Sequence, residues 1–380
     1  MRIDLVITEL DTGGAERCCV ELARFLKARG HEVRVIALGP IPTVEQAALL
    51  RLLESAGIES HFLGGRHGWM LPIIAWKLRA LLKANRPDVV QSFLWHANIL
   101  AALVVHAFKI PLVGGERVAE PRRWRHAIGR WAANRMAIVV CVSQGVADWC
   151  VKTERIDARK IRIIPNGISS ETKNALIEDC ELSLPPSAKI LLFVGRLEHQ
   201  KGIDVLLDNA AALLKRLAEH HLVIIGDGAF RSQVHAISER RELVGRVHYL
   251  GRRNDVRAWM ACSELLLLPT RYEGMPNVIL EAMAEGLAIV TTQVEGVREL
   301  LGERFNEQSV PLGAWGDFFE RVVLLANDRQ HRFELGIANR NRVQDQFNLE
   351  RQLEKYETIY ESLSVRTGQV RPTVGDSCRE

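Results

Sequence analysis

Short runs of apolar residues alternate along this chain with longer stretches in which apolar residues recur every three to four positions. The short runs, such as 33–37, 138–142 and 265–268, are almost unbroken in hydrophobicity, which is typical of strands buried on both faces of a parallel sheet. The longer stretches, such as 15–29 and 71–84, have the period of amphipathic helices. Strands and helices joined in turn by short connections form βαβ units, so the pattern predicts an α/β protein.

The alternation runs through the chain twice. In the first half we expect strands at 3–7, 33–37, 57–63, 89–92, 111–114, 138–142 and 161–164, and helices at 15–29, 43–56, 71–84, 97–108 and 123–137. In the second half we expect strands at 189–194, 222–226, 247–250, 265–268 and 288–291, and helices at 202–216, 230–240, 255–261, 276–284, 313–327, 331–346 and 348–364. The predicted fold class is therefore α/β with two doubly wound parallel sheets. Such sheets bind ligands beyond the carboxyl ends of their strands, so two sheets facing each other would place a cleft between the domains.

The boundary between the two series is marked by composition. The segment 171–187 is rich in acidic residues and contains Pro185 and Pro186, as expected of a linker. We therefore assign 1–170 to the first domain and 188–347 to the second. The segment 365–380 lacks periodicity, and we expect it to be disordered.

Composition narrows the class of protein. A net charge of +4, from 50 basic and 46 acidic residues, is too small to indicate a nucleic-acid-binding protein, and no RNA-binding module is visible. The seven cysteines form no CxxC pair, so neither a zinc site nor a disulfide framework is indicated, and a reducing cytoplasm is the simplest compartment. We see no signal peptide and no apolar run long enough to span a membrane, although the protein could lie at the inner face of one.

The strongest chemical signal follows the strand at 265–268. Its polar loop contains Glu273 and Gly274, and Pro276 is placed to open a helix whose first N–H groups form an anion site. Glu281 lies roughly 7 Å further along that helix. Two carboxylates on either side of an anion site match the sugar, diphosphate and ribose of a nucleotide sugar. The alternative is an exposed loop glutamate and an ordinary helix glutamate. The residues between them that would line such a site are Gly274, Met275, Pro276, Asn277 and Val278.

Three other segments contain glycines in the loops that follow strands. Gly195 is followed by two cations, Arg196 and Lys201, at a position suited to a diphosphate, although a solvated loop would have the same composition. After the first strand, Gly13 and Gly14 would allow a backbone to approach a ligand, or would make a plain turn.

The third segment is Gly226, Asp227 and Gly228. It could line the nucleotide, and a structural turn is at least as plausible.

In this order, the segments resemble family 4 of the retaining glycosyltransferases, also called glycosyl transferases group 1. The resemblance covers about residues 1–364, and the matching segments are Gly13 to Glu16, Asn166-Gly167, Gly195-Arg196 with Lys201-Gly202, Gly226 to Gly228, and Glu273 with Glu281 as an E-x7-E pair. It implies the GT-B fold. The first domain would lie on the acceptor side, the second would bind the nucleotide sugar, and the helix at about 348–364 would pack back on the first.

The resemblance also implies residue roles. Arg196 and Lys201 would hold the donor diphosphate, Glu281 the ribose and Glu273 the transferred sugar, while Gly14 would let its loop approach the phosphates. No metal or other cofactor is implied, and the chain has no D-x-D motif that would hold one.

One position departs from the family pattern. Many members have a histidine near the sugar in a T-x-H-like turn, where this chain has Gly114-Gly115-Glu116-Arg117. The candidate is instead His96, at the carboxyl end of the preceding strand. His96 could contact the sugar or the acceptor, and a structural histidine is equally plausible.

The stretch 117–135 contains six arginines, with Trp124 and Trp131 among them. Arginine beside tryptophan suits an anionic membrane surface or a phosphate-bearing acceptor, and the stretch 68–83 adds Trp76 and further cations. The alternative is an amphipathic packing helix with a solvated face.

These features predict a retaining glycosyltransferase that moves a sugar from a nucleoside diphosphate sugar to an alcohol, with a lipid-linked or saccharide acceptor in cell-surface polysaccharide or glycolipid synthesis. A sugar-nucleotide epimerase or hydrolase of the same architecture is an alternative enzyme. A non-catalytic sugar-nucleotide-binding subunit is an alternative from another class. A nicotinamide-dependent dehydrogenase is disfavoured because no G-x-G-x-x-G follows either first strand.

Overall fold

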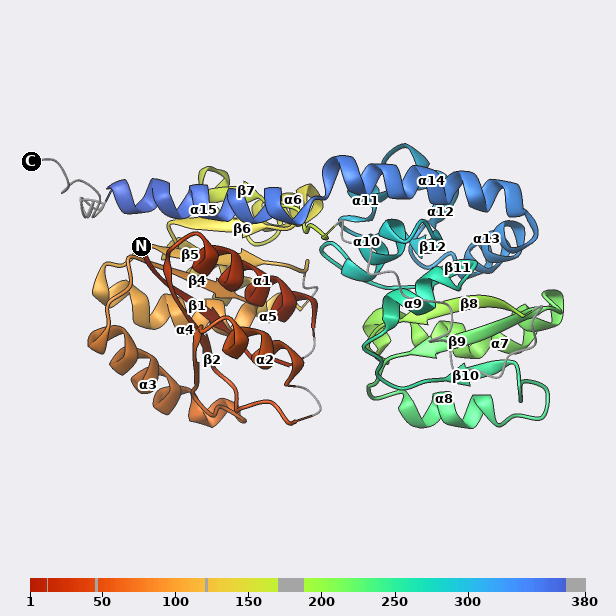
Figure 1. The fold of residues 1–380 in the computed structure, drawn as a ribbon, viewed down its shortest axis with the longest axis horizontal. Coiled ribbons are helices and arrows are strands. Elements are labelled where there is room, and N and C mark those ends of the chain that lie inside the picture. Colours follow the sequence, from red (N-terminus) through yellow and green to blue (C-terminus); the bar gives the residue numbers. More distant parts are fainter. Residues whose placement is uncertain (12, 45–46, 120–121, 170–187, 367–380) are drawn as a thin grey trace, which may run out of the picture.

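The computed structural model describes residues 1–11, 13–44, 47–119, 122–169 and 188–366. Two parallel sheets, each covered by helices, form two domains that lie side by side (Figure 1). The predicted fold class, two doubly wound parallel sheets, is confirmed.

The amino-terminal sheet has seven parallel strands in the order β3-β2-β1-β4-β5-β6-β7. These strands are β1 (Arg2–Ile7), β2 (Glu32–Ala37), β3 (Glu59–Phe62), β4 (Val89–Phe93), β5 (Leu112–Glu116), β6 (Ile138–Cys141) and β7 (Ile161–Ile163). Helices α1 (Gly14–Ala28), α2 (Ala48–Ser55) and α15 (Leu349–Arg366) share one core with the sheet, and α3 (Leu71–Ala84), α4 (Trp95–Val105), α5 (Arg123–Asn134) and α6 (Gln144–Lys152) share the other. The pleat decides the division, because Ile3, Leu5 and Ile7 enter the first core and Val6 the second.

The register between β1 and β2 explains why each of these buried strands contains a charged residue. Asp4 of β1 lies opposite Arg34 of β2, and the guanidinium donates to both carboxylate oxygens at 2.9 and 2.6 Å. Arg34 also donates to the carbonyl oxygen of Asn85 at 2.8 Å. A polar residue in each apolar run is therefore satisfied by its neighbour in the sheet.

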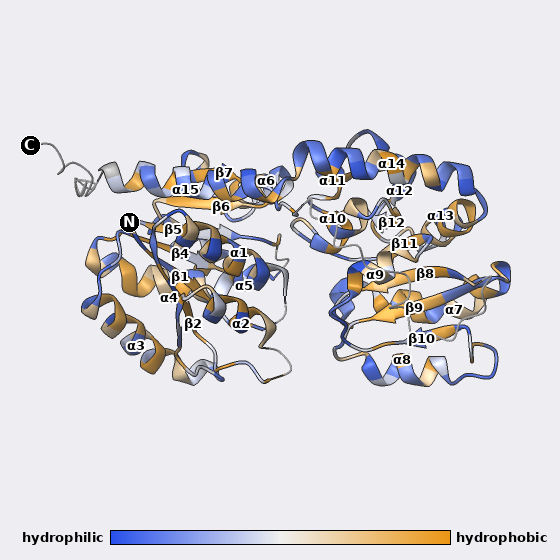
Figure 2. Cartoon of the chain, viewed as in Figure 1, coloured by the Kyte–Doolittle hydropathy of each residue, from blue (hydrophilic) through white to orange (hydrophobic). Residues whose placement is uncertain are grey.

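The carboxy-terminal sheet has six parallel strands in the order β10-β9-β8-β11-β12-β13. They are β8 (Lys189–Val194), β9 (His220–Ile225), β10 (Val247–Tyr249), β11 (Leu265–Leu268), β12 (Ala288–Thr292) and β13 (Ser309–Val310). The helices are α7 (Ile203–Arg216), α8 (Arg231–Ser238), α9 (Val256–Ala261), α10 (Asn277–Ala284), α11 (Val297–Leu301), α12 (Phe305–Gln308), α13 (Trp315–Asn327) and α14 (Arg329–Gln346). The strands of both sheets are hydrophobic and the outer faces of α14 and α15 are largely polar (Figure 2).

Helix α15 returns from the second domain and lies along the first (Figure 1). Its Tyr356 and Tyr360 are 1% and 0% exposed, and the Tyr360 hydroxyl donates to Gln91 Oε1 at 3.0 Å. Glu357 lies 2.9 Å from His31 Nε2 and pairs with Arg29. The helix is thus tied to the amino-terminal domain by both apolar and polar contacts.

Some element boundaries differ from those predicted. Helix α2 begins at Ala48 rather than at residue 43, and residues 45 and 46 of the predicted helix lie outside the described residues. The short elements α11, α12 and β13 were not predicted. The predicted linker 171–187 also lies outside the described residues, as does the predicted tail from 367 onward, whereas α15 continues through Arg366.

Among the described residues, no helix combines the length and the hydrophobicity that crossing a membrane requires.

Candidate active site

The first turns of α1 and α10 meet where the carboxyl edges of the two sheets face each other. A Cβ added to Gly14 would lie 2.4 Å from Nδ2 of Asn277, so a larger residue there would have to displace the Asn277 side chain. The N-cap residues Gly13 and Pro276 cap their helices with no side-chain hydrogen bond. The positive dipole ends of two helices, one from each domain, therefore come together, and such helix starts attract an anion. The start of α1 also carries the buried Glu16, whose carboxylate accepts its own backbone N–H.

The loop before α10 is fixed between the domains by close packing. A Cβ added to Gly274 would lie 1.9 Å from the carbonyl oxygen of Arg117, in the amino-terminal domain. The hydroxyl of Ser143, also from that domain, donates to the Gly274 carbonyl at 2.8 Å. A glycine at 274 is thus a steric requirement of the domain contact.

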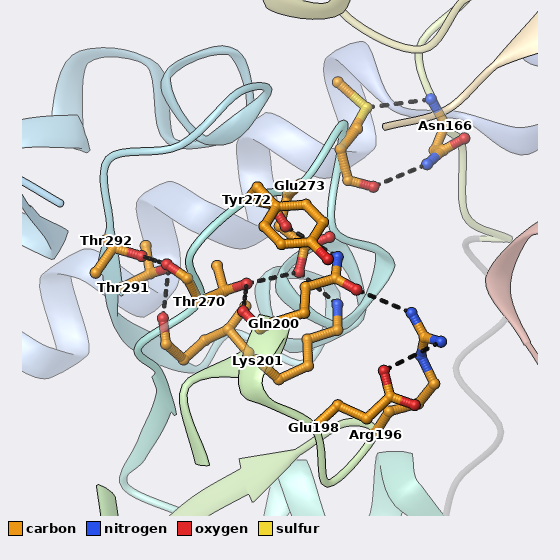
Figure 3. A network of polar contacts seen from close by, with 12 residues as sticks. Asn166, Arg196, Glu198, Gln200, Lys201, Thr270, Tyr272, Glu273, Thr291 and Thr292 are labelled. Atoms are coloured by element: carbon orange, nitrogen blue, oxygen red, sulfur yellow. Dashed lines mark hydrogen bonds and ion pairs between the residues drawn. The ribbon is translucent and has the colours of Figure 1, made fainter. Parts of the chain in front are cut away.

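Asn166 forms one of the polar bridges between the domains (Figure 3). It is 4% exposed, and its Nδ2 donates to the Met275 carbonyl at 3.0 Å and to Asn277 Oδ1 at 2.7 Å. Its own Oδ1 accepts from Arg117 Nη2 at 2.7 Å. Because every polar atom of the amide is used, Asn166 sets the position of Asn277 at the start of α10.

Glu273 and Lys201 form a buried ion pair on the second domain (Figure 3). Their side chains are 7% and 16% exposed. The hydroxyl of Thr270, itself fully buried, lies 3.1 Å from Glu273 Oε1. Gln200, beside Lys201, donates to the Tyr272 carbonyl at 3.0 Å and thereby ties the β8 loop to the β11 loop. The two segments predicted to form one site are therefore brought together.

Arg196 lies at the edge of this group and remains open to solvent. Its Nη2 donates to Gln200 Oε1 at 3.0 Å, and its side chain is 63% exposed. Burial raises the pKa of Glu9 and of Glu16 in the opposite domain, and the Arg196 charge opposes both rises. Arg196 therefore projects toward the amino-terminal domain, where a ligand between the domains would meet it.

Glu281 is held from the other side by Arg17 of α1. The Arg17 Nη1 to Glu281 Oε1 distance is 3.0 Å, and the side chains are 60% and 19% exposed. Burial raises the pKa of Glu281, and Arg17 is the strongest influence against that rise, followed by Arg257. The second carboxylate of the E-x7-E pair thus faces the amino-terminal domain.

The remaining glycine positions serve close packing. Gly226 has φ +144°, and a Cβ there would lie 1.8 Å from the Gly195 carbonyl. Gly202 has φ +70° and comes equally close to the Pro269 carbonyl. Asp227 accepts from the Gly228 N–H at 2.9 Å. These contacts are those of structural turns that keep the carboxyl ends of β8, β9 and β11 together.

His96 lies in the first turn of α4 and contacts its own domain. Its ring packs edge-on against Trp95 at 5.0 Å, and burial together with the Arg125 charge lowers its pKa. The residue before this helix, Leu94, has φ +72°, which is strained for leucine. These interactions lie within the amino-terminal domain, and the predicted contact of His96 with the sugar or the acceptor stays a prediction.

Sequence reasoning named Asn166 only as part of a matching motif, and it missed the contacts that Arg17 and Thr270 make in this site. Arg17 follows the Gly13-Gly14 motif directly, and its place in the first turns of α1 was the available signal. Arg117 was counted with the basic stretch 117–135, but its side chain turns inward to Asn166 and is not part of an exposed surface. It ends a strand, so the periodicity of the following helix does not predict its direction.

In GT-B glycosyltransferases, two parallel-sheet domains meet at the carboxyl edges of their sheets. This chain has that arrangement, with paired carboxylates, cations and helix N-termini at the contact, and its fold therefore belongs to this class. Comparisons with known proteins agree. The family model "Glycosyltransferase Family 4" matches residues 12–172, and "Glycosyl transferases group 1" matches residues 188–328. The chain belongs to this glycosyltransferase family.

Relatives and solved structures resemble the chain over most of its length. It is 27% identical over 346 residues to the lipopolysaccharide core biosynthesis glycosyltransferase LpsE of Rhizobium meliloti, covering 89% of this chain and 93% of LpsE. It is 26% identical to a Campylobacter jejuni N-acetylgalactosaminyltransferase whose name gives an undecaprenol-diphosphate-linked saccharide as acceptor, covering 91% and 94%. The structure of Anabaena HepE in complex with UDP-glucose superposes with a TM-score of 0.83 at 20% identity, covering 95% of this chain and all of that one.

Proposed function

We propose that this glycosyltransferase takes a sugar from a nucleoside diphosphate sugar, retains its anomeric configuration, and transfers it to a hydroxyl group of a lipid-linked saccharide. The carrying observation is that Lys201 pairs with Glu273 in the loop before α10, while the Arg196 charge acts on Glu16 in the first turn of α1, which meets α10 at the contact of Gly14 with Asn277. Two side-chain cations beside two helix starts suit a diphosphate. Glu273 and Glu281 lie on either side of it, as the sugar and ribose hydroxyls of such a donor require.

The reaction needs the departing diphosphate to be stabilised. As the bond between the anomeric carbon and the phosphate oxygen breaks, negative charge grows on that oxygen, where Lys201, Arg196 and the N–H groups of α10 would meet it. The acceptor oxygen forms its bond on the same face of the sugar, and its proton passes to the departing phosphate. The geometry assigns no nucleophilic role to Glu273, because its carboxylate is held by Lys201 and Thr270.

Metal independence is part of the proposal. Two side-chain cations and two helix starts supply the charge that a divalent ion would otherwise bring to the diphosphate. Transfer should therefore persist in the presence of excess EDTA.

The donor is tested by isothermal titration with UDP, GDP and ADP and then with their sugars. One nucleoside class should bind wild-type protein and lose most of its affinity in Glu281→Ala. Incubation with that sugar donor and an undecaprenyl-diphosphate-linked saccharide should yield an elongated saccharide with the α linkage of an α-linked donor. Release of free nucleotide without an elongated product would favour a hydrolase instead.

An acceptor at a membrane is supported by one face of the amino-terminal domain. Helices α3, α4 and α5 pack in sequence on one side of the sheet, and these three helices, described in full, contain no acidic residue. Trp69, Trp76 and Trp124 are 73%, 69% and 59% exposed on or beside them. The exposed cations of α3 and α5 are Arg79, Lys83, Arg123 and Arg130. Exposed tryptophan beside unopposed cations suits an anionic lipid surface.

Sedimentation with vesicles tests this surface. Wild-type protein should bind vesicles containing phosphatidylglycerol and not vesicles of phosphatidylcholine alone, and Trp69→Ser with Trp76→Ser should weaken binding by about tenfold or more. Phe333→Ser is the matched control, because Phe333 is 64% exposed on the other domain. Equal binding by the double variant and wild type would argue against this face.

A further inference from the structure

The ion pair between Arg17 and Glu281 joins the second domain's helix α10 to the first domain's helix α1, across 264 positions of sequence. The two partners differ in their surroundings. Glu281 is largely covered, whereas the Arg17 side chain is 60% exposed. Only one of the guanidinium nitrogens, Nη1, is committed to Glu281. A guanidinium carries five N–H groups in a flat fork, so Arg17 has further donors to offer a ligand.

Arg17 lies one turn from the place where the two helix starts converge. Gly14, three residues before it, is in contact with Asn277, the first residue of α10. Glu281 is four residues after Asn277, so both members of the pair stand one turn inside their helices. A nucleotide whose diphosphate rests at the helix starts and whose ribose reaches Glu281 must pass beside Arg17.

We infer that Arg17 is a donor-binding residue that the amino-terminal domain contributes, and that it exchanges its bond with Glu281 for a bond to the nucleotide's diphosphate. The inference rests on the proposed function, since it assumes that Glu281 receives the ribose. A carboxylate that accepts two adjacent hydroxyls uses both oxygens, and in the empty protein Oε1 is occupied by Arg17. Donor binding therefore frees the guanidinium at the moment when a phosphate anion comes within reach.

A second cation near Glu281 shows why Arg17 is singled out. Arg257 also affects Glu281, but it belongs to α9 of the same domain and is bonded to Glu285 at 2.5 Å. Because Arg257 and Glu281 belong to the same domain, Arg257 stays near Glu281 whatever the relative position of the two domains. Arg17 is the partner whose bond depends on the approach of the two domains, so its transfer to the donor links nucleotide binding to domain contact.

The experiment compares a nucleoside diphosphate with its nucleoside. Wild type, Arg17→Met, Arg17→Lys and the control Arg24→Met are titrated with UDP and uridine, GDP and guanosine, and ADP and adenosine. Arg24 is on the same helix and pairs with Glu21 in solvent, at 3.2 Å. Arg17→Met should lower the affinity for the nucleoside diphosphate by about tenfold or more and change the affinity for the nucleoside by less than about twofold. Arg17→Lys should recover part of the loss, because it keeps the charge without the fork.

The outcomes separate the inference from the proposed function. The inference is overturned if Arg17→Met binds the nucleoside diphosphate as tightly as wild type does. It is also overturned if the affinities for the diphosphate and the nucleoside fall by the same factor, because Arg17 then acts only on Glu281. If wild-type protein binds none of the three diphosphates, the proposed donor class fails, and the role of Arg17 fails with it. Unchanged melting temperatures in Arg17→Lys and Arg24→Met show that the comparison is made between folded proteins.

Discussion

Both domains bury glutamates near their contact, and they treat the charge in opposite ways. In the carboxy-terminal domain Glu273 is paired with Lys201, and Glu281 is paired with Arg17 across the domain boundary. Each carboxylate is largely buried and has a cation beside it. An opposite charge favours the ionised form of a carboxyl group, whose oxygens are strong acceptors for hydroxyls. At Glu281 burial still raises the pKa, and the Arg17 charge opposes that rise.

In the amino-terminal domain burial dominates the pKa values of Glu116 and Glu154, and the His126 charge opposes the rise at Glu154. Burial raises the pKa of Glu116 to about 8, with the Glu154 charge as the second cause, and burial raises the pKa of Glu154 to about 7. Glu116 accepts a hydrogen bond from Asn98 Nδ2 at 3.0 Å, and Glu154 Oε2 has no hydrogen-bond partner among the described residues. The contrast is between two carboxylates that each pair with a lysine or an arginine and two buried carboxyl groups whose raised pKa values favour the neutral, protonated state.

The largest effect is expected from breaking the charged pair. Lys201→Met leaves Glu273 buried without its cation, so it should destabilise the protein by about 3–5 kcal/mol and lower kcat by about 100-fold or more. The double variant Lys201→Met/Glu273→Gln should regain most of the stability in denaturant unfolding without regaining activity. Lys215→Met, an exposed lysine of α7, is the control. Wild-type turnover in either Lys201 variant would remove this pair from the active site.

The raised pKa values of Glu116 and Glu154 should make the stability of the protein depend on pH. Carboxyl groups whose pKa values rise to about 7 and about 8 in the folded protein, from an ordinary 4.5, hold protons that the unfolded chain has released. Stability should therefore fall as pH rises from the ordinary pKa through the two raised values, by about 4 kcal/mol between pH 6 and pH 8.5. Glu154→Gln should flatten the dependence measured by urea unfolding, and an unchanged slope would mean that the pair is ionised.

Arg196→Ala tests a cation that has no buried partner. Because its side chain is largely exposed, the melting temperature should stay within a few degrees of wild type while kcat falls by roughly tenfold or more. Arg216→Ala, which removes an exposed ion pair with Glu320 on α7 and α13, should change neither. A loss of stability without a loss of turnover would place Arg196 among structural residues.

The smallest expected effect is a shift in the pH dependence of donor binding. Because burial raises the pKa of Glu281, nucleotide affinity should begin to fall at a higher pH than an ordinary glutamate would give, as the carboxylate takes up a proton. Removing the opposing charge in Arg17→Met should move the midpoint further upward. Nucleoside affinity measured over a range of pH checks the direction of this shift. A downward shift of the midpoint in Arg17→Met would contradict the contact between Arg17 and Glu281.

The sequence predicted the parts of this molecule that depend on local pattern. The strands at 189–194 and 265–268 and the helix at 71–84 match β8, β11 and α3, because unbroken or periodic hydrophobicity leaves few alternatives. The two residues of β13 are too few to carry a periodic signal, and the start of α2 at Ala48 has no side-chain cap to mark it. Membership of a glycosyltransferase family was predicted from motif order and is confirmed.

The contacts between the domains were beyond the reach of sequence pattern. Arg17 and Glu281, or Asn166 and Asn277, are distant along the chain, and nothing local specifies how one sheet faces the other. The roles predicted for Glu273, Arg196 and Lys201 stay predictions until the variants above are measured. Their gathering in one group follows from a rule of topology, since loops at the carboxyl ends of adjacent parallel strands lie at the same edge.

The return of α15 to the first domain has a consequence for the order in which the protein forms during synthesis. The first domain leaves the ribosome first, yet the buried Tyr360 that closes its core is 269 residues away from its partner Gln91. The second domain has all of its strands and helices by residue 346, so it leaves the ribosome before α15 does. The domain begun first is therefore completed last, and its apolar surface stays uncovered for much of translation.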